Sequence, residues 1–152
     1  MAVSESADSG ERRPPLRAVV DTNVVLDLVL GRESWASQAR PMWAARDAKR
    51  LEAYLPASVL TDIFYICRKQ IGADRAKLAV EECLRRFTIL PLDRMLLEAA
   101  LALPGPDFED NVQIACARAS GLDLIVTRDL AGFADAPIPA VEPSNMPAYL
   151  RS

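Results

Sequence analysis

The chain has 152 residues, of which 51% are hydrophobic and 26% are charged, and its formal net charge is −3. This composition is typical of one globular domain and excludes a protein that attracts nucleic acid through overall positive charge. No stretch approaches the ~18 apolar residues that a membrane-spanning helix needs, and residues 1–15 do not resemble a signal peptide. We therefore expect a cytoplasmic protein with no membrane segment.

Residues 1–15 are polar and end in two prolines, which predicts a disordered tail before a single domain over residues 16–152. The three cysteines lie far apart in predicted helices, and their odd number argues against a disulfide framework and against a zinc site. In a reducing compartment we expect three buried thiols, at Cys67, Cys83 and Cys116.

Apolar runs alternate with helix signals along the domain. We predict strands at residues 16–20, 51–55, 87–90, 122–127 and 138–141. Between them we predict helices at residues 22–30, 34–50, 58–70, 73–86 and 93–103, and a further helix that Asp107 caps and Gly121 ends. Pro41 should kink or break the second helix, and Ser58 should cap the third. Strands separated by helices of ten or more residues predict an α/β fold, in which a parallel sheet has helices on both faces.

Two of the predicted buried strands lead into carboxylates. One apolar run ends directly at Asp21, and another leads through Thr127 and Arg128 to Asp129. The carboxyl ends of strands are where open α/β sheets bind their ligands. The alternative interpretation is local, with Asp21 as a helix cap and Asp129 in a turn or paired with Arg128.

Two further acids lie on predicted helices. Asp62 shares the apolar stripe of its helix with Val59 and Ile66 and has no local cation. A carboxylate buried in this way needs a distant arginine, a proton or a metal to compensate its charge. Asp110 lies in the first turn of the helix that Asp107 caps, where the helix dipole favours a negative charge, and the same turn can face the sheet edge.

If these four carboxylates converge, they repel one another unless a divalent cation lies among them. The chain has no histidine, and ligation by oxygen alone favours Mg²⁺ or Mn²⁺ over zinc or copper. The same lack excludes RNA cleavage by paired imidazoles and any Ser-His-Asp triad. A fifth acid, Asp27, lies in the middle of a helix, where we expect it to face solvent or pair with Arg32.

In this order the motifs resemble the PIN domain, most closely the bacterial toxins of the VapC type. The matching segments are residues 19–23, 58–65, 106–110 and 125–129, and the resemblance covers about residues 17–142. It implies a three-layer α/β/α fold with a five-stranded parallel sheet of order 3-2-1-4-5.

The resemblance also implies an endoribonuclease that cleaves single-stranded RNA by Mg²⁺- or Mn²⁺-activated water. By this resemblance the acidic cluster consists of Asp21, Asp62, Asp110 and Asp129, with Asp21 and Asp110 on the principal ion. Asn23 and Thr127 would be polar supports of the cluster. Much of the family has glutamate where this chain has Asp62, which leaves open whether one metal or two is bound. A toxin of this kind would have a cognate antitoxin as its partner and would form a homodimer.

Several side chains near the expected site are candidates for contacts with the RNA backbone: Arg32, Arg46, Lys49, Arg50, Arg68 and Lys69. Each is equally explained as part of a solvated helix face. Trp35 and Trp43 flank Pro41, and we expect them to pack in the core or at a dimer interface rather than to stack on bases.

Three other functions fit parts of this pattern. A phosphatase of the haloacid-dehalogenase type also has an aspartate after its first strand, but its motif needs a second aspartate where this chain has Asn23. A PIN-like module could bind RNA or protein without catalysis, although all four acids are present. A nuclease of the same fold that cuts DNA, akin to flap endonucleases, would carry insertions that a chain of this length lacks.

Overall fold

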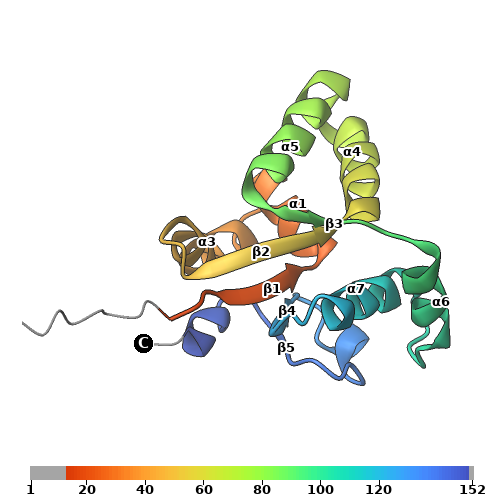
Figure 1. Ribbon diagram of the computed structural model, residues 1–152. Helices are drawn as coiled ribbons and strands as arrows, with labels where there is room; N and C mark the ends of the chain where they lie inside the picture. Colours follow the sequence, from red (N-terminus) through yellow and green to blue (C-terminus); the bar gives the residue numbers. More distant parts are fainter. Residues whose placement is uncertain (1–12, 151–152) are drawn as a thin grey trace, which may run out of the picture.

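The computed structural model describes residues 13–150, and Figure 1 shows how its elements are arranged. The strands are β1 (Leu16–Val20), β2 (Leu51–Pro56), β3 (Thr88–Leu90), β4 (Leu124–Val126) and β5 (Ala140–Val141). The α-helices are α1 (Thr22–Leu30), α2 (Trp35–Gln38), α3 (Arg40–Asp47), α4 (Ala57–Ile71), α5 (Ala73–Arg86), α6 (Arg94–Ala102) and α7 (Phe108–Ala119), and two 3₁₀ helices are η1 (Ala131–Phe133) and η2 (Met146–Tyr149). Most of the tail predicted as disordered, residues 1–12, lies outside the described residues.

The five strands form one parallel sheet in the order β3-β2-β1-β4-β5, which confirms the predicted topology. Neighbouring side chains of a strand point to opposite faces of the sheet. In β1, Ala18 and Val20 join the core beneath α1, α3, α4 and α5, whereas Val19 joins the core beneath α6 and α7. The sheet is therefore the middle of three layers, with a core on each face (Figure 1).

The register of the two central strands determines where the site can form. Val20, the last residue of β1, pairs with Val126, the last residue of β4. The residues that follow, Asp21 and Thr127, therefore leave the sheet side by side at its carboxyl edge. The amide of Asp21 donates to the carbonyl of Val126 (2.8 Å), which extends the pairing to the start of the loop.

Some predicted helix and strand bounds are wrong at their ends. The predicted break within residues 34–50 is present and separates α2 from α3, but it lies at Ala39 instead of Pro41. Pro41 lies in the first turn of α3, where a missing amide donor costs nothing. Ser58 does not cap α4, because the helix begins at Ala57, after Pro56 in extended backbone, and places Ser58 inside the first turn. Strands β4 and β5 are shorter than predicted, with three and two residues.

The three cysteines are buried and unpaired, as predicted from their number and spacing. Burial in apolar surroundings raises the pKa of Cys83 to about 12 and that of Cys116 to about 11. These thiols therefore act as small core side chains. Within residues 13–150, no helix has both the length and the apolar character needed to cross a membrane.

Candidate functional site

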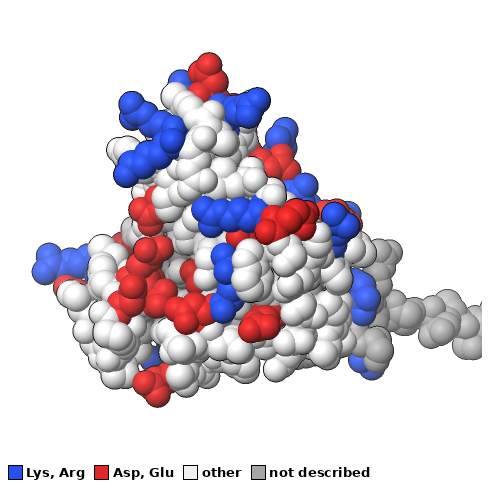
Figure 2. Space-filling view, turned by 180° about the vertical axis from the view of Figure 1, so that it is seen from behind, with Lys and Arg blue, Asp and Glu red and all other residues white. Residues whose placement is uncertain are grey.

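Acidic side chains gather at the carboxyl edge of the sheet. Figure 2 shows them on one face of the molecule, below the protruding α4–α5 pair, with basic side chains at the border of the group. The predicted acids come from four elements: Asp21 from the end of β1, Asp62 from α4, Asp110 from the first turn of α7 and Asp129 from the loop after β4.

Asp21 is 7% exposed, and three hydrogen bonds hold its carboxylate. Oδ1 accepts from the amide of Thr22 (2.7 Å) and from Nε2 of Gln113 (2.9 Å), and Oδ2 accepts from the hydroxyl of Thr127 (2.7 Å). Asp21 thus caps α1, as the local interpretation predicts, and is also oriented from two other elements. A carboxylate has about four lone-pair positions, so Oδ2 keeps one for a ligand.

Thr127 links two of the acids through one hydroxyl group. It is fully buried, donates to Asp21, and accepts from the amide of Asp129 (2.9 Å). The carboxylate of Asp129 in turn accepts from the amide of Gly132 (3.2 Å), which closes the loop after β4 into a tight turn. The predicted supporting role of Thr127 therefore has a geometric basis, whereas its function in catalysis stays a prediction.

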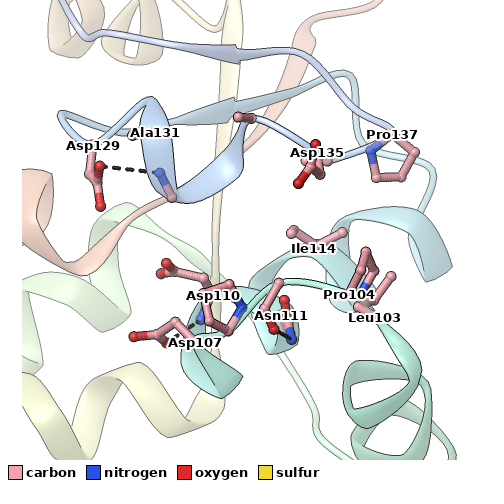
Figure 3. Close-up of a pocket in the computed structure, with 15 residues that line it drawn as sticks. Leu103, Pro104, Asp107, Asp110, Asn111, Ile114, Asp129, Ala131, Asp135 and Pro137 are labelled. Carbon is pink, nitrogen blue, oxygen red and sulfur yellow. Dashed lines mark hydrogen bonds between the residues drawn. The ribbon is translucent and has the colours of Figure 1, made fainter.

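Asp110 and Asp129 approach each other over Gly132. A Cβ atom added to Gly132 would lie 2.9 Å from Oδ2 of Asp110 and 2.8 Å from Oδ2 of Asp129. Figure 3 shows the two side chains on opposite walls of a cavity, Asp110 from α7 and Asp129 from the loop. A side chain at this position would force the ends of both carboxylates to move away from where they now lie.

The cavity between them has a volume of about 270 Å³. Its walls are the connection between α6 and α7 on one side and the loop after β4, continuing past η1, on the other (Figure 3). Asp110 and Asp129 lie at one end, and the exposed Asp135 lines the wall further along. The acids thus border an open space large enough for part of a ligand.

Asp110 is the acid whose titration is most perturbed. Partial burial raises its pKa to about 7, and the negative charges of neighbouring carboxylates act in the same direction. These neighbours, in decreasing order of effect, are Asp107, Asp21, Asp129 and Glu109. A bound cation would remove this repulsion and restore the ionised form.

Glu109 belongs to the same group, although the sequence did not single it out. Its Oε1 accepts from the hydroxyl of Thr22 (3.1 Å). Loss of water around the carboxylate raises its pKa, the Thr22 hydrogen bond opposes the rise, and Asp62 contributes the largest effect of any neighbouring charge. The one available signal was its position beside Asp110; only the fold brings Thr22 and Asp62 to it.

The structure corrects the prediction that Asp62 is buried. Val59 and Ile63 are buried beneath α4, but Asp62 is only half-buried, and it has no hydrogen bond or ion pair to any other described residue. The α4–α5 pair extends away from the sheet (Figure 1), so water reaches this side of the helix. Its negative charge contributes to the raised pKa of Glu109, so the two carboxylates lie within electrostatic range of each other.

Asp27 was expected to face solvent or pair with Arg32, and the first expectation is wrong. Asp27 is 2% exposed and receives two hydrogen bonds from Arg128, at 2.7 Å from Nε and 3.2 Å from Nη2. Arg32 lies 3.9 Å from the same carboxylate. Arg128 therefore does not pair with Asp129, which was the alternative role considered for that acid.

Asn23 contacts the site only weakly. Its Oδ1 accepts from the amide of Arg128 at 3.5 Å, the outer limit for a hydrogen bond, and it makes no hydrogen bond to Asp21. Its proposed role is thus to support the loop rather than the carboxylate.

The basic and aromatic candidates divide into core and surface groups. Arg46 is not free for RNA, because it donates to the carbonyls of Arg85 and Arg86 at the end of α5. Trp43 is buried and packs edge-to-face on Phe87, as expected for a core residue. Four basic side chains remain exposed: Lys49, Arg50, Arg68 and Lys69.

The donor set fits a hard divalent cation, although the acids are not preassembled around one. Among the described residues, no three acidic, cysteine or histidine side chains are close enough to hold a metal as positioned. All available donors are carboxylate oxygens, Asp21 keeps a free lone pair, and both burial and neighbouring carboxylates raise the pKa of Asp110, so a cation there would be favourable. A cation would draw together the side chains of Asp110 and Asp129, which already meet over Gly132.

The fold and the site define this chain as an α/β protein with carboxylates at the carboxyl edge of a parallel sheet. Comparison with known proteins identifies its family. The family model described as "PIN domain" matches residues 17–131, and the chain belongs to that family. A comparison with curated proteins found no match.

Solved structures share the fold at low sequence identity. DNA-bound VapBC from Salmonella typhimurium matches with a TM-score of 0.65 at 19% identity, covering 84% of this chain and 98% of the other. A toxin–antitoxin complex from Klebsiella pneumoniae has a TM-score of 0.63 at 24% identity, covering 83% and 97%. Mycobacterium tuberculosis VapC20, described as a toxin that cleaves the sarcin-ricin loop, has a TM-score of 0.59 at 18% identity, covering 71% and 86%.

Proposed function

We propose that this PIN-domain protein is a metal-dependent endoribonuclease that cleaves single-stranded RNA and serves as the toxin of a toxin–antitoxin pair. The observation that carries the proposal is the meeting of Asp21, Asp110 and Asp129 at one sheet edge, with the pKa of Asp110 raised to about 7. Family membership and the fold shared with toxin–antitoxin proteins support it.

In this proposal Asp21 and Asp110 hold the principal ion, Mg²⁺ or Mn²⁺, and Asp129 and Asp62 contribute to a second ion or orient the attacking water. When bound, such an ion polarises phosphoryl oxygens and lowers the pKa of water. Thr127 keeps the Asp21 carboxylate in one orientation through its 2.7 Å hydrogen bond. Glu109, which accepts a hydrogen bond from Thr22 at the start of α1, is a further acceptor for a water proton.

The proposed partners follow from the same comparison. A cognate antitoxin would cover the acidic face in the resting cell, and homodimer formation and a cytoplasmic location stay predictions. Large apolar side chains exposed on α6, Met95 and Leu101 among them, provide a surface that a second chain could cover.

The test uses the purified protein without antitoxin, incubated with labelled single-stranded RNA in Mn²⁺, Mg²⁺ or EDTA. The Asp110→Asn variant removes one carboxylate charge, and Asp135→Asn makes the same change at an exposed position on the same cavity. We expect metal-dependent cleavage by the wild type and by Asp135→Asn, and none by Asp110→Asn. An Asp110→Asn protein that cleaves at the wild-type rate would contradict the proposal. Metal binding without cleavage of any RNA would favour the non-catalytic binding module.

A further inference from the structure

The loop that carries Asp129 is attached to α1 by a buried ion pair. Asp27, in the middle of α1, is 2% exposed, and the guanidinium of Arg128 binds both of its oxygens, at 2.7 Å and 3.2 Å. The two residues are 101 positions apart in the sequence. A two-point contact of this kind fixes the direction of the guanidinium as well as its distance.

The same arginine has further contacts around it. Its guanidinium carbon lies 4.3 Å from the ring centre of Trp35, which covers it on one side, and its backbone amide points to Asn23. Arg32 also approaches the Asp27 carboxylate, with its Nη1 3.9 Å from Oδ1. Arg128 is therefore held by side chains from α1 and from the segment that follows it.

Residues 127–129 are thus held by two separate contacts to other elements. Thr127 donates to Asp21 at the end of β1, Arg128 donates to Asp27 in α1, and the amide of Asp129 donates to the Thr127 hydroxyl. The carboxylate at the end of this segment is placed opposite that of Asp110, and two negatively charged carboxylates that lie so close repel each other when no cation is present. A loop free to move would relieve the repulsion by turning away.

The geometry points to Asp27 and Arg128 as a positioning pair that holds the loop of Asp129 in place, so that its carboxylate stays opposite Asp110 before a metal binds. The effect on metal binding rests on the proposed function, in which Asp129 is one of the acids that bind the metal. Among the described residues, the side chains of Asp27 and Arg128 make no hydrogen bond or ion pair to Asp21, Asp110 or Asp129. They act through the loop.

The test removes the pair without leaving a buried charge. Leucine has the branched shape of aspartate, and replacing a buried ion pair by apolar residues of similar volume often leaves stability unchanged or raises it. The variant is Asp27→Leu with Arg128→Met. The matched control is Glu82→Leu with Arg86→Met, because Arg86 also pairs with a carboxylate and lies over a tryptophan, Trp43, away from the acids.

Residue-resolved amide hydrogen exchange without metal is the direct measurement. The amides of Asp129 and Gly132 donate to side chains within this loop, so their exchange reports whether the loop keeps its shape. We expect both to exchange about tenfold faster in the Asp27→Leu/Arg128→Met variant, with sheet amides unchanged, and no change in the control. Unchanged exchange at both amides, or faster exchange throughout the sheet, would overturn the inference.

Measuring the affinity for a metal ion tests whether Asp27 and Arg128 position Asp129 or only stabilise the fold. Calorimetric titration with Mn²⁺ should show about tenfold weaker binding by the variant, in the range seen when groups that orient metal ligands are removed. Equal Mn²⁺ affinity in variant and wild type would overturn the positioning role. If the wild type binds no Mn²⁺, the proposed function fails, and the exchange result still decides whether the pair holds the loop. Should the double variant not fold, Arg128→Lys keeps the charge but loses the two-point contact, and a smaller change in the same direction is then expected.

Discussion

Replacing Asp110 by asparagine should stabilise the metal-free protein at pH 8 while abolishing its proposed activity. The pKa of Asp110 is about 7 in the folded protein, against an ordinary value of 3.8. Because the folded-state pKa is the higher one, folding is favoured when Asp110 is protonated. That contribution is complete below about pH 4 and is lost as the pH rises through about 7. Asparagine has nearly the same shape and no charge to repel its neighbours.

The size of the effect follows from the shift. About three pKa units correspond to at most about 4 kcal/mol at pH 8. Asp110 is only partly buried, and water screens its neighbours, so we expect about 1–2 kcal/mol. For a chain of this length that is a rise in Tm of about 3–6 °C.

The assay is thermal unfolding in EDTA at pH 5 and pH 8, with Asp135→Asn as the control. Asp110→Asn should unfold at a higher temperature than the wild type at pH 8, and the difference should shrink at pH 5. Adding Mn²⁺ at pH 8 should raise the Tm of the wild type above that of Asp110→Asn, because a ligand stabilises the form that binds it. Equal Tm values for wild type and Asp110→Asn at pH 8 in EDTA would refute the claim that burial and neighbouring carboxylates make ionised Asp110 unfavourable at this site.

Two further variants test the contacts around the acids. Thr127→Val removes the hydroxyl that joins Asp21 to the Asp129 amide. It should lower the free energy of unfolding, measured by chemical denaturation, by about 1–3 kcal/mol. It should also lower the rate of RNA cleavage, measured with labelled RNA, by about 10–100-fold. Full activity in Thr127→Val would show that the hydroxyl does not orient the carboxylates. Gly132→Ala places a methyl group against Asp110 and Asp129, which should weaken Mn²⁺ binding by about tenfold in calorimetry with little change in Tm. An unchanged Mn²⁺ affinity in Gly132→Ala would mean that a metal does not draw these two carboxylates together there.

The elements of the fold were predictable because their signals are local. Helices α1 and α5 begin and end where the apolar spacing and the glycines predict, and Asp93 and Asp107 cap α6 and α7 through their own side chains. The errors lie where local signals compete. Ser58 is a good cap by composition, but Pro56 ends β2 in extended backbone and the helix begins directly after it.

By itself, then, the sequence determined that this protein is a parallel α/β domain with Asp21 and Thr127 directly after buried strands, since hydrophobic period and helix capping act over a few residues. Only the tertiary structure decided which of the acids meet. The register of β1 and β4 places Thr127 on Asp21, the turn at Gly132 brings Asp129 to Asp110, and α1 supplies Asp27 to Arg128. These contacts join residues about a hundred positions apart, or depend on the path of a loop. Their energies come from charge and burial in the folded chain, which no local pattern encodes.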